Sequence, residues 1–275
     1  MRRPARCSGK PTRWRISARA ARRRGFAARP AIWKESVILH IGAADACYIA
    51  LDKSTGEVAW RGGTDPVGYG TPIFVRHGGE DLMIGWTPEN IAGFDPDTGE
   101  QLWAIPYAVK YGVSIATPIF HENLALVCGY WHGSRAIRLG KTRADAELAW
   151  EEDEFLRGLM AQPLYKNGFV YLLDKEHGLT CFRLADGKKL WDDDHRITPS
   201  DRNPQATFVR LGGSDEVLIL NANGELIHGA LRESGYEEFW RAQAAGKTWA
   251  HPAYANGCAF TRDDRQIAAY RLPVE

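Results

Sequence analysis

Short apolar runs of four to seven residues alternate along the chain with clusters of Gly, Asn and Asp. Residues 161–191 show this arrangement as PLYK, NG, FVYLLD, KEHG, LTCFRL, ADG and KKLW. Runs rich in Val, Ile, Tyr and Phe between turn residues are typical of antiparallel strands joined by hairpins. No window keeps the 3.6-residue period of an amphipathic helix. The pattern therefore predicts an all-β chain.

The predicted strands recur at a fixed interval. A phrase of a small or polar residue, Pro, an apolar residue and an aromatic residue occurs in RPAIWK (29–34), GTPIFV (70–75), ATPIFH (116–121), AQPLYK (161–166) and AHPAYA (250–255). The units that begin near 71, 116, 161, 206 and 251 are 45 residues apart, and QATFVR at 206 lacks the Pro. Four strands per unit, repeated around an axis, indicate a β-propeller. We expect about five full blades and a partial sixth, forming an incomplete ring of a propeller with seven or eight blades.

Proline at the start of each unit fits the innermost strand of a blade. One edge of that strand faces the central channel, where a missing N–H costs little.

A second phrase marks the outer part of each unit, in ALDKSTGEVAW (50–60), GFDPDTGEQLW (93–103) and CFRLADGKKLW (181–191). We read it as the end of the third strand, a turn and the fourth strand. Asp52, Ser54 and Thr55 can cap the turn, and Gly56 supplies its positive φ. Gly99, Gly187 and Gly235 stand at the matching place. The fourth-strand residues are Trp60, Trp103, Trp150, Trp191 and Trp240.

These tryptophans are predicted to be structural rather than catalytic. An indole can pack on the side-chain-free surface of a glycine turn in the neighbouring blade. Small residues at the first position of the phrase, Ala50, Gly93 and Cys181, fit a crowded contact. Two units depart from the pattern. RLGKTRADAELAW (138–150) has lost the glycine turn, so we expect a looser hairpin, and ALRESGYEEFW (230–240) has one extra residue.

The motif Ala50-x-Asp52-x-x-Thr55-Gly56-x-x-x-Trp60 resembles the tryptophan-docking repeat of pyrroloquinoline-quinone-like (PQQ-like) propellers. That family includes quinoprotein alcohol dehydrogenases, the propeller lipoprotein of the outer-membrane β-barrel assembly machine, and uncharacterised exported bacterial proteins. The closing stretch TWAHPAYANGCAFTRDDRQIAAYRL is similar to the last blade of the uncharacterised group. The resemblance covers residues 30–275 and implies a propeller that acts in the cell envelope.

Two functions follow from the resemblance. One is a non-catalytic scaffold that binds a protein or a small ligand through its loops, because a rigid disk leaves the loops free to vary. The alternative is a PQQ-dependent dehydrogenase, which holds the quinone between a Trp and a disulfide of adjacent Cys and uses Ca²⁺. The chain has no adjacent Cys pair and no carboxylate cluster at first-strand positions. We therefore expect the scaffold, with no catalytic, cofactor-binding or metal-binding residues.

Aromatic and His residues at predicted loop tips are candidates for surface recognition. Aromatic side chains in loops often anchor binding partners. The alternative, which we favour slightly over recognition, is that they line the mouth of the channel. The candidates are Trp86, Trp131, His132, Trp249 and His251.

Cysteine and histidine spacing predicts neither a disulfide framework nor a metal site. The five Cys form an odd set without CxxC, and the eight His show neither HxH nor HExxH. The acidic runs EEDE (151–154) and DDDHR (192–196) lack the spacing of a calcium loop and fit solvated loops.

The net charge of +1 hides a division of charge along the chain. Residues 1–29 contain eleven Lys or Arg and no acid, and the remainder carries 24 basic against 34 acidic residues. The first segment is interpreted as a disordered tail ahead of a propeller domain at 30–275. It has no apolar stretch of an export signal. We expect a mis-assigned start or a truncated coding region rather than a nucleic-acid arm, although TRWRIS (12–17) alternates like a closing strand. We also expect a monomer.

Overall fold

The computed structural model describes residues 28–158, 160–201, 203 and 205–273. The predicted tail at 1–29 lies almost entirely outside these residues. Contacts divide the chain into two compact units, Met1–Asn123 with Arg138–Glu147, and Leu124–Ile137 with Leu148–Glu275.

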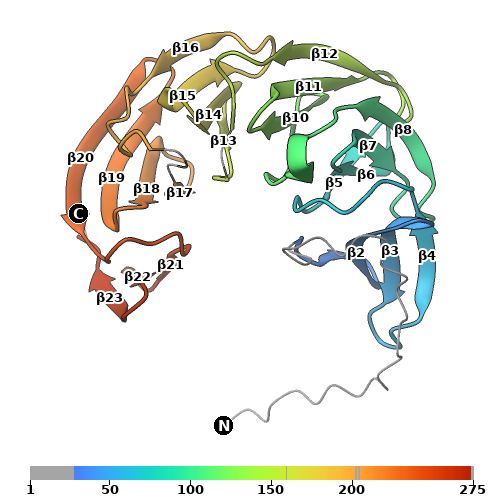
Figure 1. Ribbon diagram of the computed structural model, residues 1–275, viewed down its shortest axis with the longest axis horizontal. Coiled ribbons are helices and arrows are strands. Elements are labelled where there is room, and N and C mark those ends of the chain that lie inside the picture. The colour runs from blue at the N-terminus through green and yellow to red at the C-terminus, as the bar shows by residue number, and fades with distance from the viewer. Residues whose placement is uncertain (1–27, 159, 202, 204, 274–275) are drawn as a thin grey trace. The chain divides into compact units, whose positions relative to one another are not determined.

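Antiparallel sheets account for the regular structure of the described residues, as the sequence predicts (Figure 1). The first sheet has the order β1(Ala31–Trp33), β2(Ser36–Ala43), β3(Ala46–Asp52), β4(Val58–Gly62). The second has β5(Ile73–His77), β6(Glu80–Trp86), β7(Asn90–Phe94), β8(Gln101–Pro106). A short 3₁₀ turn, η1(Lys110–Gly112), follows β8.

The next three sheets repeat the same order. The third contains β9(Ile119–His121), β10(Leu124–Gly129), β11(Gly133–Leu139), β12(Ala146–Glu152). The fourth contains β13(Leu164–Lys166), β14(Phe169–Asp174), β15(Gly178–Arg183), β16(Lys189–Asp192). The fifth contains β17(Ala206–Arg210), β18(Glu216–Asn221), β19(Glu225–Arg232), β20(Gly235–Gln243).

The last sheet has three strands among the described residues, in the order β21(Ala253–Ala255), β22(Cys258–Arg262), β23(Ile267–Arg271). These strands form the partial sixth blade that the sequence predicts. Each predicted proline immediately precedes the first strand of its sheet, at the sheet edge, where no ladder hydrogen bond is lost.

The core lies on the second and third strands of the four-stranded sheets. β10 is buried throughout, and β3, β14 and β15 are buried along most of their length. In the second unit one apolar cluster joins β14 and β15 to β18 and β19. In the first unit a cluster around Tyr48 and Phe94 joins β3 to β7. Outer strands alternate between exposed and half-buried residues because only one of their faces packs on a neighbour.

Four outer strands carry a β-bulge at the same place. Trp60 is paired with Ala50, but the next pair is Val58 with Leu51, so Ala59 has no partner. The register shifts equally at Trp103, Trp191 and Trp240. A bulge turns the strand locally and re-aims the side chains next to it. Leu190 and Phe239 occupy the unpaired position and are exposed.

Candidate functional site

The repeated tryptophans dock on backbone of the following sheet. The indole N–H of Trp60 donates to the carbonyl of Pro96 at 3.1 Å, and that of Trp150 donates to Leu184 at 2.8 Å. The rings lie on Gly99 and Gly187, where a Cβ atom would stand 2.4 Å from Trp60 and 2.8 Å from Trp150. These indoles hold neighbouring sheets together and are not available to a ligand.

The crowding at the first position of the motif has a direct cause. A Cβ on Gly93 would lie 2.2 Å from the Trp103 ring in the same sheet. Ala50 and Cys181 are fully buried at the same pairing position, opposite Trp60 and Trp191. The indole of the outer strand therefore lies over the third strand of its own sheet and also contacts the next sheet.

The third unit holds its turn without glycine, and the hairpin is well fixed rather than loose. Trp103 donates to the carbonyl of Arg143 at 3.0 Å. The Arg143 guanidinium reaches back to the Asp95 carboxylate at 2.7 Å and to the Asp81 carbonyl. Asp145 caps the turn through the amide and the hydroxyl of Thr142. An ion pair and a carboxylate cap therefore replace the glycine contact.

Gly235 and Gly56 differ from the other two motif glycines. Gly235 has φ of +149°, and no atom lies within 4 Å of where its Cβ would be. The extra residue makes a different hairpin, in which Trp191 donates to the carbonyl of Arg232 at 3.1 Å. Gly56 has φ of +74°, close to that of Gly99, but a Cβ atom on Gly56 would meet no atom within 4 Å.

The last of the five tryptophans, Trp240, packs against an apolar cluster that includes Ala259.

Trp86 is not a surface residue, which corrects the sequence prediction. It is 1% exposed and stacks on Tyr107, with ring centroids 5.7 Å apart. The segment after β8 covers the β6–β7 hairpin, and the Tyr107 amide donates to the Glu89 carbonyl at 2.8 Å. The polar residues around Trp86 suggested a loop tip, but no sequence pattern marks the segment that covers it.

The other recognition candidates do not form one patch. Trp131 and His132 lie in the turn between β10 and β11, where Trp131 packs edge-on against Tyr130. His132 is exposed. Trp249 and His251 lie ahead of β21 and are both exposed, and Trp249 lines a groove to which His251 does not contribute.

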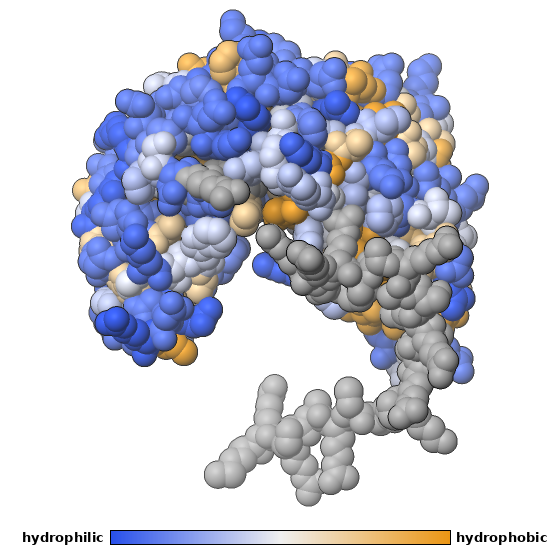
Figure 2. All heavy atoms as spheres, viewed as in Figure 1, coloured by the Kyte–Doolittle hydropathy of each residue, from blue (hydrophilic) through white to orange (hydrophobic). Residues whose placement is uncertain are grey.

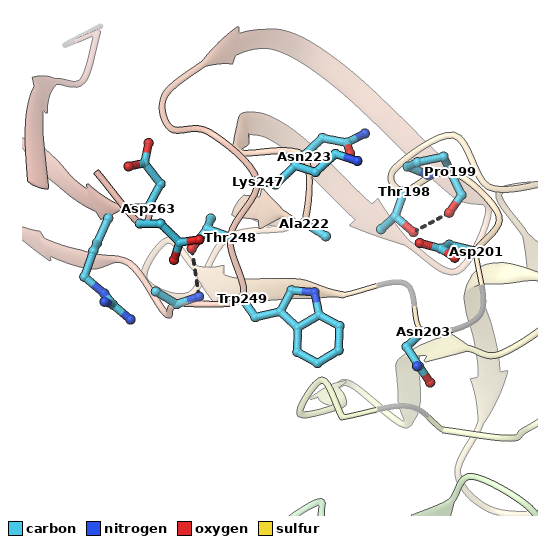
Figure 3. Close-up of a pocket in the computed structure, with 13 residues that line it drawn as sticks. Thr198, Pro199, Asp201, Asn203, Ala222, Asn223, Lys247, Thr248, Trp249 and Asp263 are labelled. Carbon is cyan, nitrogen blue, oxygen red and sulfur yellow. Dashed lines mark hydrogen bonds between the residues drawn. The ribbon is translucent and has the colours of Figure 1, made fainter. Parts of the chain in front are cut away.

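Trp249 stands in an open groove of about 620 Å³ in the second unit (Figure 3). Its side chain is the large aromatic surface of the groove, and the residue is 54% exposed. Figure 3 shows the indole between Asp263 on one side and Asn203 on the other. The remaining wall residues are mostly polar or charged: Thr198, Pro199, Asp201, Ala222, Asn223, Lys247, Thr248, Ala250, Arg262 and Asp264. Figure 2 shows a predominantly hydrophilic surface over β18–β23.

Hydrogen bonds fix the backbone on both sides of the groove. The Asp263 carboxylate accepts the amide of Gly246 at 2.7 Å and those of Arg265 and Gln266 in its own hairpin. These three amide bonds lower the pKa of Asp263 below its ordinary value, so the carboxylate is ionised at neutral pH. On the other side, Thr248 donates its amide to the carbonyl of Ala222 at 3.0 Å. Trp249 is therefore carried by a segment anchored at its base.

The groove offers an aromatic face beside charges of both signs. Lys247 and Arg262 supply cations, and Asp201 and Asp264 supply carboxylates. Such a surface can hydrogen-bond a polar chain while the indole packs on its apolar part. Sequence reasoning selected Trp249 but missed the rest of the wall, because its members come from loops that are distant in sequence. Among the described residues, no group of three His, Cys, Asp or Glu side chains could hold a metal ion.

Comparison with known proteins places the fold. Residues 8–193 match the family model described as Outer membrane protein assembly factor BamB. The match begins inside the basic segment that the sequence analysis sets apart. Over an alignment of 83 residues the chain is 37% identical to 1-butanol dehydrogenase (quinone) of Thauera butanivorans, and the match covers 24% of this chain and 13% of that enzyme. The chain therefore spans only a small part of the curated relative it matches.

Two solved structures agree with this chain at the level of the fold. The computationally designed protein Ika8 is 12% identical with a TM-score of 0.63, over 89% of this chain and 70% of that chain. The quinohemoprotein alcohol dehydrogenase of Comamonas testosteroni is 11% identical with a TM-score of 0.51, over 80% of this chain and 43% of that chain. BamB of Moraxella catarrhalis is 15% identical with a TM-score of 0.49, over 89% of this chain and 84% of that chain.

Among the described residues, no helix is long and apolar enough to cross a membrane.

Proposed function

Since the chain belongs to the PQQ-like propeller family whose model is described as Outer membrane protein assembly factor BamB, we propose that it is a non-catalytic scaffold that binds a protein partner in the cell envelope. The family description supports a partner engaged in the assembly of outer membrane proteins. We also propose that the protein is exported to the cell envelope. The partner is held at the groove around Trp249.

The observation that carries this proposal is the exposure of Trp249. Trp60 and Trp150 have a structural role, because their N–H groups are hydrogen-bonded and their rings pack on glycine backbone. Trp249 has no such role, since more than half of it is exposed within a polar groove. A rigidly mounted aromatic residue surrounded by hydrogen-bonding groups is the kind of anchor that dominates binding energy at protein interfaces.

The first test is genetic complementation joined to crosslinking. In the source organism without the chromosomal copy, Trp249→Ala is expected to restore the level of folded outer membrane proteins at least tenfold less effectively than the wild-type chain. A photo-crosslinking residue at Lys247 is expected to capture a defined envelope protein, and Trp249→Ala should abolish that crosslink. His251→Ala is the matched control, because His251 is exposed nearby but does not line the groove. Full activity of Trp249→Ala in both assays refutes the proposal.

A quinone-dependent dehydrogenase is the second candidate, supported by the 37% identity with the 1-butanol dehydrogenase segment. Among the described residues, no three His, Cys, Asp or Glu side chains are grouped so that they could hold a metal ion, so no residue of this chain is given a catalytic role. Incubation with PQQ and Ca²⁺, followed by dye reduction with 1-butanol, distinguishes the two candidates. Saturable turnover would favour the enzyme.

A further inference from the structure

β23 is exposed where the equivalent strands of other sheets are buried. β3, β7, β15 and β19 are third strands with a fourth strand beside them, and most of their residues are buried. In β23, Ile267 is 77% exposed and Tyr270 is 38% exposed. Among the described residues β23 has β22 as its one strand neighbour. A hydrophobic strand with an uncovered edge is a template for pairing with another chain.

The register shows which position of this edge is special. In the last sheet Ala253 pairs with Phe260, which pairs with Ala269. In the first sheet Ala31 pairs with Ile38, which pairs with Ala50. Since Ala31 and Ala253 both follow the proline of their unit, Ala269 is the equivalent of Ala50. Ala50 is the residue that faces Trp60. β23 therefore keeps the small residue that admits an indole.

The backbone of β23 also presents donors as β3 does. The amide of Leu272 donates to the carbonyl of Gly257, and that of Asp263 donates to Gln266. Because antiparallel bonding alternates along a strand, the amides of Ala269 and Arg271 lie on the outer edge. Arg271 is the equivalent of Asp52, whose amide donates to the carbonyl of Glu57 at 2.8 Å as the fourth strand begins.

We propose that the outer edge of β23 binds an extended segment of a partner polypeptide that runs antiparallel to it and sets a tryptophan against Ala269. Addition of a strand to a sheet edge gives affinity through main-chain hydrogen bonds and specificity through side-chain pockets. The exposed Arg271 adds charge complementarity to a Glu three residues before the tryptophan. That spacing occurs in the chain's own outer strands, as Glu57 before Trp60 and Glu100 before Trp103.

The proposal is tested with a labelled peptide of the sequence TGEVAWRGG, taken from residues 55–63, and the full chain. Fluorescence anisotropy is expected to show saturable binding. Ala269→Pro removes an outward amide without touching the amides that bond β22, and should weaken binding at least tenfold. Replacing the peptide tryptophan with alanine should have a similar effect. Arg271→Glu should weaken binding about threefold, a modest loss typical of a single exposed ion pair.

Controls separate this surface from the groove. Trp249→Ala should leave peptide binding unchanged, so failure of the groove proposal and failure of the strand proposal give different results. If circular dichroism shows that Ala269→Pro does not fold, Ala269→Lys places a bulky side chain at the same point and should also weaken binding at least tenfold.

Three results would overturn the proposal. One is the absence of peptide binding, or binding that Ala269 variants do not change. Another is concentration-dependent dimerisation lost in Ala269→Pro, which assigns the edge to a second copy. The third is peptide binding that appears only after Trp14→Ala, which assigns the edge to residues 12–17 of the chain itself.

Discussion

At the scale of single residues, two glycines with the same backbone conformation meet different surroundings. Gly99 and Gly56 have φ of +78° and +74°. A methyl group on Gly99 would stand 2.4 Å from the Trp60 ring, whereas one on Gly56 would meet nothing within 4 Å. The cost of a side chain in the left-handed region is about 1 kcal/mol at both places.

Gly99→Ala is therefore expected to destabilise the chain more than Gly56→Ala does. The first variant should lower the free energy of unfolding by about 3 kcal/mol, because it combines backbone strain with displacement of a buried ring. The second should cost about 1 kcal/mol. Urea titration followed by tryptophan fluorescence measures both. Equal losses would show that the indole contact contributes nothing beyond the turn.

The sequence predicted the position of side chains that recur in several units better than that of side chains that occur once. The glycine turn and its tryptophan occur in several copies, so their spacing predicted the close contacts of Trp60 and Trp150. Trp86 occurs once, and a polar neighbourhood was taken as a sign of exposure. Its burial depends on Tyr107, a residue of a connecting segment that no periodic pattern marks.

At the scale of the hairpin, ionised aspartates close the turns. Asp52 accepts the amides of Ser54 and Thr55 at 2.9 and 2.7 Å, and Asp263 accepts three amides. These bonds hold the pKa of both carboxyls below the ordinary value of 3.8. A lowered pKa in the folded state means that the ionised form stabilises the fold.

The stability should consequently fall in acid. The contribution of these carboxylates is fully present above the unfolded pKa of about 3.9 and disappears as the pH falls through the folded values. The urea midpoint is expected to be level from pH 7 to 5 and to drop from pH 4 to 2. Asp263→Asn keeps an acceptor oxygen but cannot titrate, so it should flatten part of the drop. A midpoint that rises toward pH 2 contradicts the assignment.

The third hairpin shows the limit of motif reading at this scale. Loss of the glycine predicted a loose turn, but Arg143 bonds to Asp95 in the preceding sheet. Burial opposes ionisation of Asp95, yet bonds from the Asp97 and Thr98 amides and from Arg143 outweigh it and lower the pKa. A long side chain that reaches another sheet leaves no local trace in the sequence.

At the scale of the whole molecule, the fold was predictable and the groove was not. Units about 45 residues long recur five times in the sequence, so the repeat is recognisable even where a single unit is irregular. The groove wall is formed by residues 198, 199, 201, 203, 222–223, 247–250 and 262–264. Such residues are brought together by tertiary structure alone, and sequence pattern identified one of them.

Free thiols are another property of the whole fold. Cys47, Cys128 and Cys181 are buried and Cys258 is half-buried. Burial raises the pKa of Cys128 and of Cys181 to about 12, which suppresses the reactive thiolate. Iodoacetamide at pH 8 is therefore expected to label Cys258 at least tenfold faster than these two, measured by peptide mass spectrometry. In urea the three should react alike. Rapid labelling of native Cys128 would contradict its burial.

Trp60, Trp103, Trp191 and Trp240 each follow one residue that has no partner in the third strand. Successive tryptophans are 43, 47, 41 and 49 residues apart from Trp60 to Trp240, and the first strands of successive sheets begin 42, 46, 45, 42 and 47 residues apart. The length of the unit therefore varies at its inner and its outer strands alike. Because the bulge lies at the same place in these four outer strands, copies can differ in length while the indole keeps its place opposite the third strand.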